Sequence, residues 1–191
     1  TRCSGATRLG LVEEQFKYRA FISYSHADQQ WAAWLHKALE TYRVPKHVVG
    51  RETGFGPVPE RFAPVFRDRD ELASSNDLSA AIQSALDASD ALIVICSPAA
   101  AASPWVNTEI RRFQSSGREG RIFTLVVAGS TQPAAPDCAF PAALLVTEDG
   151  RKLPDPLAAD PSEYADGRRG AVLKIVAGLL GVGIDELRRR D

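Results

Sequence analysis

The sequence predicts an α/β domain in which an open parallel sheet of about five strands carries helices on both faces. Strand-like apolar runs alternate with amphipathic helical segments about four times along the chain. The run at residues 91–96 is apolar without alternation, as expected for a parallel strand that is covered on both sides. The 191 residues suit a single domain, and 45% hydrophobic with 25% charged residues is an ordinary globular composition.

The first strand is expected at residues 19–24, followed by helix-capping side chains at 25–28. The first helix has one apolar stripe at helical spacing, made by Trp31, Trp34, Leu35, Ala38, Leu39 and Tyr42. Residues 43–63 show no period and contain several prolines and glycines, so we expect an inserted loop there. The sequence does not indicate its role.

The rest of the chain continues the alternation. Further strands are expected at residues 64–66, 91–96 and 122–127, with a short strand at 143–147. Further helices are expected at residues 78–86, 105–115 and 172–180, with an additional turn at 184–190. Ser103 and Pro104 supply a cap and a first-turn proline for the helix at 105–115, and Gly181 is a stop signal for the last long helix.

Composition and missing motifs exclude several classes of protein. The 23 basic and 24 acidic residues give a net charge of −1, without the basic footprint of a nucleic-acid-binding domain. The apolar runs are too short to cross a membrane. No GxGxxG, GxxxxGK[ST] or GxSxG motif occurs, so a Rossmann cofactor site, a phosphate loop and a hydrolase elbow are unsupported. A phospho-receiver domain would need an aspartate after the third strand, where this chain has Ser97.

Cysteine and histidine placement predicts no metal site. Cys3, Cys96 and Cys138 are far apart and form no CxxC pair, which favours a reducing compartment over a disulfide framework. The three histidines do not stand at metal-ligand spacings, and His36 is interpreted as a solvated residue of the first helix.

Three segments carry polar residues at the carboxyl ends of the predicted strands, where open parallel sheets place their ligands. They are FISYSHAD at residues 21–28, FRDRDEL at 66–72, and Ser97-Pro98 followed by SPWVNTE at 103–109. In this order and spacing they resemble the Toll/interleukin-1 receptor (TIR) domain family, in its bacterial style, over about residues 18–180. The resemblance implies the flavodoxin-like TIR fold.

The resemblance also implies a function. TIR domains either associate with one another as signalling adaptors or cleave NAD, and in the enzymes a glutamate lies four residues after a tryptophan on the third helix. Trp105 and Glu109 match that pair. Cleavage releases neutral nicotinamide, so a single carboxylate suffices to stabilise the positive charge that grows on the ribose. Glu109 is thus the candidate catalytic residue, with a solvated or capping glutamate as the alternative. Trp105 is either a stacking residue or a core residue.

Other candidate residues for NAD binding follow from the same resemblance. Phe21, Tyr24 and Ser25 match the nicotinamide side of the family's pocket, although Phe21 can equally be a core residue. Ser25 and His26 stand where some members have arginines that are able to contact phosphate. The resemblance is therefore weaker for contacts to the phosphates of NAD. The remaining candidates are Arg67 and Asp68 in the loop after the second strand, which can equally form a surface charge cluster, and Ser97 after the third strand.

These interpretations give a definite set of expectations. Residues 1–17 are expected to form a polar leader, 18–181 the TIR domain, and 182–191 a helix end or a linker to a region outside this chain. The chain contains no methionine, so we expect it to be a piece of a longer protein. We expect a cytoplasmic NAD glycohydrolase that uses NAD as substrate without a cofactor and is activated by self-association. Other TIR domains are further candidate partners. The alternatives are a non-catalytic association module and an enzyme acting on free nucleosides.

Overall fold

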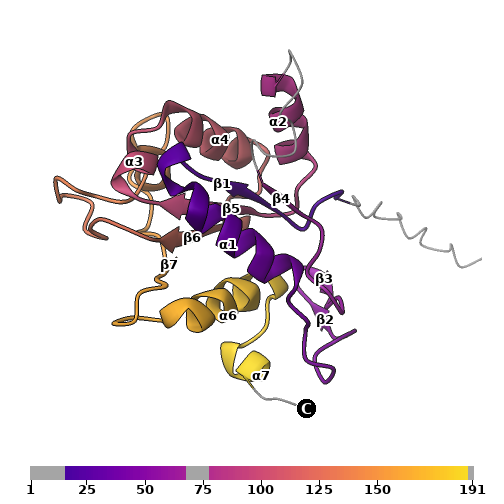
Figure 1. The fold of residues 1–191 in the computed structure, drawn as a ribbon. Coiled ribbons are helices and arrows are strands. Elements are labelled where there is room, and N and C mark those ends of the chain that lie inside the picture. The colour runs from indigo at the N-terminus through magenta and orange to yellow at the C-terminus, as the bar shows by residue number, and fades with distance from the viewer. Residues whose placement is uncertain (1–15, 68–77, 189–191) are drawn as a thin grey trace, which may run out of the picture.

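A computed structural model describes residues 16–67 and 78–188. Its main sheet has five strands in the order β4-β1-β5-β6-β7, and every pairing within it is parallel (Figure 1). The strands are β1 (Ala20–Ser23), β4 (Val65–Arg67), β5 (Leu92–Cys96), β6 (Ile122–Val126) and β7 (Ala158–Ala159). This is the flavodoxin-like order 2-1-3-4-5, which confirms the predicted fold class.

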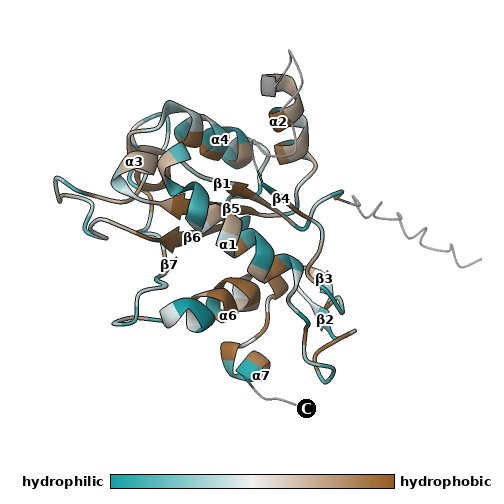
Figure 2. Ribbon diagram, in the orientation of Figure 1, coloured by the Kyte–Doolittle hydropathy of each residue, from teal (hydrophilic) through white to brown (hydrophobic). Residues whose placement is uncertain are grey.

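Helices cover both faces of the sheet. One face carries α1 (Gln29–Glu40) and α6 (Gly167–Leu180), and the other carries α2 (Leu78–Asp87) and α4 (Pro104–Ser115) (Figure 1). Figure 2 shows that the central strand β5 is hydrophobic, whereas α1 and α4 carry both hydrophobic and hydrophilic residues. The two layers are therefore separate apolar clusters on a shared sheet.

Side chains of β1 alternate between these two layers. Ala20, Ile22 and Tyr24 join the cluster under α1 and α6, and Phe21 joins the cluster under α2 and α4. Ser23 follows the same alternation and lies on the α4 side of the sheet. The polar side chain at the last position of β1 therefore lies in the α4 layer.

One prediction of secondary structure was wrong, and one short helix was missed. Residues 143–147 do not form a strand, because Pro141 precedes a helical turn, α5 (Ala142–Leu145), and the fifth strand is instead β7. The short helix α3 (Pro98–Ala101) was not predicted. It forms because the Ser97 hydroxyl accepts a hydrogen bond from the amide of Ala100, 3.0 Å away, and Pro98 occupies the first turn.

The insertion at 43–63 contains a small hairpin, β2 (Glu52–Thr53) and β3 (Gly56–Pro57), and contacts the last described helix. Arg51 pairs with Glu186 in the helix α7 (Ile184–Arg188), and the ring Nε2 of His47 lies 2.9 Å from the Glu186 carbonyl oxygen. Leu187 is buried in the same core cluster as α1 and α6. Within residues 182–188, α7 thus packs on the domain.

His36 is not a solvated residue, which corrects the sequence-based interpretation. Its ring is only partly exposed, and Nε2 lies 3.0 Å from the carbonyl oxygen of Val65. The contact links α1 to the edge strand β4. His36 therefore has a structural role between two elements of the fold.

Candidate functional site

A buried polar contact lies at the carboxyl end of β1. The hydroxyl of Ser23 donates a hydrogen bond to Oε2 of Glu109 on α4, at 2.5 Å. Ser23 is fully buried and only 7% of Glu109 is exposed. A carboxylate is thus held inside the α4 layer, next to the edge of the sheet where ligands of this fold class bind.

The sequence of α4 explains why Glu109 is buried. The Ser103 hydroxyl caps the first turn by accepting from the amide of Val106, and Pro104 begins the helix. Val106, Ile110 and Phe113 then form a buried apolar stripe, and Glu109 lies within it. This face of α4 is buried, and the alternative of a solvated Glu109 is excluded.

Trp105 differs from Glu109 although it lies one helical turn before it. It stands in the first turn of α4, and its side chain is 55% exposed. The alternative interpretation of Trp105 as a core residue is wrong. An exposed indole beside a buried carboxylate is able to stack on a planar ring that approaches from solvent.

A second buried polar pair joins the ends of β1 and β5. The Ser97 hydroxyl donates to Oδ2 of Asp28 at 2.6 Å, and both residues are buried. Burial raises the pKa of Asp28, and the hydrogen bond from Ser97 acts in the opposite direction. The Ser97 oxygen also caps α3. These contacts give Ser97 a structural role, because they fix the segment between β5 and α3.

The remaining predicted residues fall into three groups. Phe21 is fully buried and stacks on Phe66, with ring centroids 5.2 Å apart, and Tyr24 is buried on the opposite side of the sheet. Ser25 is partly exposed, and its oxygen accepts a hydrogen bond from the amide of Ala27. His26 is exposed, Arg67 is half-buried at the end of β4, and Asp68 lies outside the described residues.

Sequence reasoning missed Ser23 and Asp28 as members of this region. Both lie inside the FISYSHAD segment, and a signal for Ser23 was available. It is a polar residue in a strand whose other described positions are apolar and buried. Asp28 is the last residue of the short 3₁₀ helix His26–Asp28, and only the folded chain brings it to Ser97.

The described residues hold no group of three or more His, Cys, Asp or Glu side chains able to bind a metal ion. Within the same residues, no helix is long and apolar enough to cross a bilayer. Two large pockets lie away from Glu109. One, of about 730 Å³, lies between α1 and α6, and the other, of about 760 Å³, lies between the second half of α4, β6 and residues 144–157. Neither is lined by Glu109 or Trp105.

Known proteins resemble the chain over this region. A family model described as TIR domain matches residues 20–155. The NAD(+) hydrolase ApTIR from Actinoplanes sp. is 38% identical over 114 residues, which are 59% of this chain and 14% of that protein. The chain thus spans only a small part of the length of this relative. A solved structure of TIR domains in the activated Roq1 resistosome, directly recognizing the pathogen effector XopQ, matches over 60% of each chain with 19% identity and a TM-score of 0.43.

Proposed function

The chain belongs to the TIR domain family, and we propose that it is an NAD-cleaving module of a longer protein. It cleaves the bond between nicotinamide and ribose, and releases nicotinamide together with ADP-ribose or a cyclised form of it. The observation that carries the proposal is the buried carboxylate of Glu109 with its bond to Ser23. The resemblance to a bacterial NAD(+) hydrolase over more than half of the chain supports it.

Burying a carboxylate is unfavourable, so its position needs an explanation. Glu109 lies among Val106, Ile110 and Phe113, where an apolar side chain would serve packing better. Inside this layer a negative charge acts through a lower effective dielectric than in water, and it stabilises a nearby positive charge more strongly. Catalysis of a reaction with a cationic transition state accounts for a glutamate at this position.

The chemistry needs only one such group. As the glycosidic bond breaks, its electron pair goes to the pyridinium nitrogen, and nicotinamide leaves uncharged without a proton from an acid. Positive charge develops on the ribose, and the Glu109 carboxylate stabilises it. The oxygen of a water molecule then bonds to the ribose carbon, and its proton is released to solvent. In the cyclised product, a nitrogen of the adenine replaces that water.

The other residues act around this centre. Ser23 orients the carboxylate through its hydrogen bond, and the exposed Trp105 stacks on the nicotinamide ring. Ser25, His26, Arg67 and Asp68 are proposed contacts for the rest of the dinucleotide. Phe21, Tyr24 and Ser97 act by fixing the strand ends that carry these contacts.

We further propose that the domain is the effector part of a bacterial signalling or defence protein, acts in the cytoplasm, and is activated when copies associate. Other TIR domains are possible members of such an assembly. The cysteine pattern supports a reducing compartment. A second candidate function is a non-catalytic association module, which the large exposed surface of Trp105 favours.

The test is nicotinamide release from NAD by the purified chain over a range of protein concentrations. Glu109→Gln is expected to lower the rate by about 10²–10³-fold, the cost of removing one group that stabilises transition-state charge. Glu119→Gln makes the same chemical change at an exposed glutamate and should leave the rate unchanged. Activity per molecule should rise with concentration if association activates the domain.

Two results would contradict the enzymatic proposal. One is the absence of nicotinamide release from concentrated protein, and the other is full activity of Glu109→Gln. If Trp105→Ala then weakened association of the inactive chain, the association module would be the better description.

A further inference from the structure

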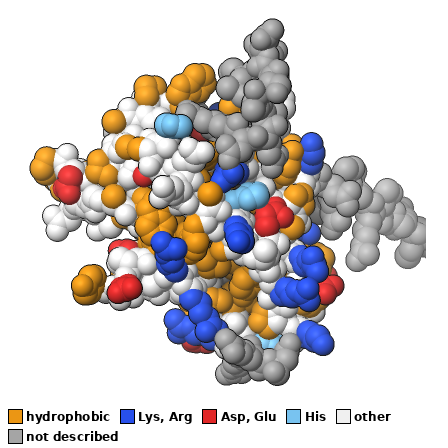
Figure 3. Space-filling model, viewed as in Figure 1, with side chains coloured by type: hydrophobic (Ala, Val, Ile, Leu, Met, Phe, Trp, Pro, Cys, Tyr) orange, Lys and Arg blue, Asp and Glu red, His pale blue; other side chains and the backbone are white. Residues whose placement is uncertain are grey.

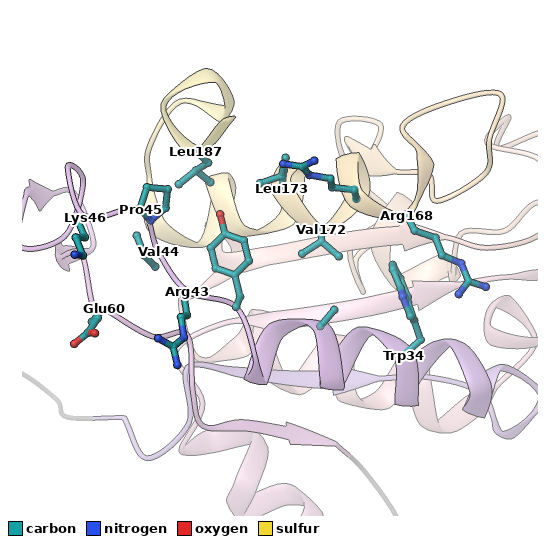
Figure 4. Close-up of a pocket in the computed structure, with 13 residues that line it drawn as sticks. Trp34, Arg43, Val44, Pro45, Lys46, Glu60, Arg168, Val172, Leu173 and Leu187 are labelled. Atoms are coloured by element: carbon teal, nitrogen blue, oxygen red, sulfur yellow. The ribbon is translucent and has the colours of Figure 1, made fainter. Parts of the chain in front are cut away.

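A groove of about 730 Å³ lies on the opposite face of the sheet from Glu109, between α1, α6 and the insertion at 43–63 (Figure 4). Trp34 and Tyr42 of α1 line it together with Val172, Leu173 and Leu187. The volume is within the range of small-molecule sites, which is roughly 300–1,000 Å³. The groove is therefore large enough for a ligand of nucleotide size.

Charge in the groove is strongly one-sided. Four of its lining residues are cations, Arg43, Lys46, Arg168 and Arg169, whereas Glu60 is its one acidic residue. The whole chain has a net charge of −1, so this excess of positive charge is local. Figure 3 shows Lys and Arg side chains gathered around a hydrophobic band on this face of the molecule. The combination favours a ligand that is both anionic and partly apolar.

Arg168 and Arg169 are not explained by the stability of their own helix. They lie in the first turn of α6, where the helix dipole disfavours cations. Neither takes part in an ion pair among the described residues. Both line the groove, and Figure 4 shows Arg168 beside Trp34. An anion bound there would be attracted by both guanidinium groups.

Aromatic side chains hold one of these arginines in place. The guanidinium carbon of Arg168 lies 5.1 Å from the ring centroid of Trp31 and 5.4 Å from that of Trp34. Figure 4 shows Trp34 and Arg168 approaching each other from α1 and α6. Such cation–π contacts reduce the freedom of the arginine before any ligand arrives. The groove thus presents a positioned guanidinium beside an aromatic wall.

We propose that this groove binds a nucleotide, with its phosphates between Arg168 and Arg169 and its base against Trp34, Tyr42 and Leu173. Guanidinium groups match phosphate oxygens with paired hydrogen bonds. Aromatic side chains stack on the flat face of a base regardless of its identity. Because the site is on the other side of the sheet, it is separate from the proposed NAD-cleaving centre at Glu109.

The test is calorimetric titration of the chain with ADP, accompanied by adenosine and inorganic pyrophosphate as separate ligands. ADP should bind the wild-type chain, pyrophosphate should compete with it, and adenosine alone should bind more weakly. The double variant Arg168→Gln/Arg169→Gln is expected to bind ADP at least about tenfold more weakly, because each charge-assisted contact to phosphate contributes more than a kilocalorie.

A matched control removes two consecutive arginines from α4. Arg111→Gln/Arg112→Gln makes the same change of charge on the other face of the sheet, away from the groove, and should bind ADP as the wild type does. Hydrogen exchange locates the ligand, since bound ADP should protect the amides of residues 34–46 and 167–173. Thermal unfolding checks that both double variants fold.

Three outcomes would overturn the proposal. The first is equal affinity of the two double variants for ADP, and the second is no ADP binding by the wild type at millimolar concentration. The third is a change in self-association of the Arg168 and Arg169 variant without any change in ADP binding, which would assign the groove to a second copy of the chain. None of these measurements depends on NAD cleavage, so they leave the proposal for Glu109 untouched.

Discussion

The two layers on either side of the sheet differ in what they bury. The layer under α1 and α6 has an apolar cluster that includes Ile22, Leu35 and Val176, all within 2% of complete burial. The layer under α2 and α4 is built around apolar side chains as well, but it also encloses Glu109 and its partner Ser23. The buried cluster of the first layer is apolar, whereas the second layer gives up some stability to hold a charge.

Strand β1 shows this difference at the scale of one residue. Ile22 and Ser23 are neighbours in sequence and are both fully buried. They face opposite layers because strand side chains alternate, so one joins the core and the other holds a carboxylate. The difference teaches that a single short strand can supply both a core residue and a residue of the candidate site. Substitutions at these two positions separate the roles.

The largest expected effect is on the apolar side. Ile22→Ala removes a fully buried side chain from the α1 and α6 layer and should lower the free energy of unfolding by about 2–5 kcal/mol. Urea unfolding followed by circular dichroism measures it. A loss well below this range would mean that the layer closes around the cavity, and the contrast between the layers would be weaker than described.

On the α4 side, Ser23→Ala should cost less stability but more activity. It leaves the buried Glu109 carboxylate without the hydroxyl donor, which is expected to cost about 1–3 kcal/mol. Ser89→Ala is a matched control, because the hydroxyl of this equally buried serine donates to a neutral acceptor, the Ala85 carbonyl, at 2.7 Å. The control should cost about 0.5–1.5 kcal/mol and leave NAD cleavage intact. Equal losses in both variants would show that the charge on Glu109 does not matter to folding.

The smallest effect concerns the second buried carboxylate, Asp28, and its dependence on pH. Burial raises the pKa of Asp28 in the folded state above its ordinary value of 3.8, so its ionisation opposes folding. The contribution of Asp28 to stability is fully present below that ordinary value and is lost as the pH rises through the raised pKa. Asp28→Asn should therefore gain stability relative to the wild type as the pH rises above 3.8.

Asp149 provides the control of opposite sign for this pH dependence. The hydrogen bond from Thr147 lowers the pKa of the exposed Asp149 carboxyl. Its contribution is present above the ordinary pKa and is lost as the pH falls. Asp149→Asn should thus lose stability relative to the wild type over the same rise in pH. Denaturant midpoints measured at several pH values show whether each variant gains or loses stability relative to the wild type. If the midpoints of Asp28→Asn and of the wild type changed with pH in parallel, the expectation would be contradicted.

Much of this architecture was predictable from local pattern. The apolar run that forms β5 and the Ser103-Pro104 start of α4 are strong local signals, and both elements begin within one residue of the predicted positions. The positive-φ stop of α6 at Gly181 followed from glycine chemistry in the same way. Elements with a local signal in their own sequence, such as hydrophobic periodicity or a helix cap, were therefore predicted.

Elements that depend on distant partners were missed. β7 has only two residues, Ala158 and Ala159, and it is a strand because β6 pairs with it. Ser23 was passed over because its partner Glu109 is 86 positions away, and the pairing of Asp28 with Ser97 spans 69 positions. The identity of Glu109 as a candidate came from the resemblance to the TIR family, but its burial is a property of the folded layer.

The hairpin in the insertion at 43–63 has a consequence for how the chain reaches this fold. Its contact between Arg51 and Glu186 joins residues 135 positions apart, whereas β1 finds its partners β4 and β5 much earlier in the chain. Contacts between residues so far apart in the sequence form slowly, because a long loop must be ordered first. During synthesis, the contact between the insertion and α7 can therefore form only after nearly all of the domain has left the ribosome.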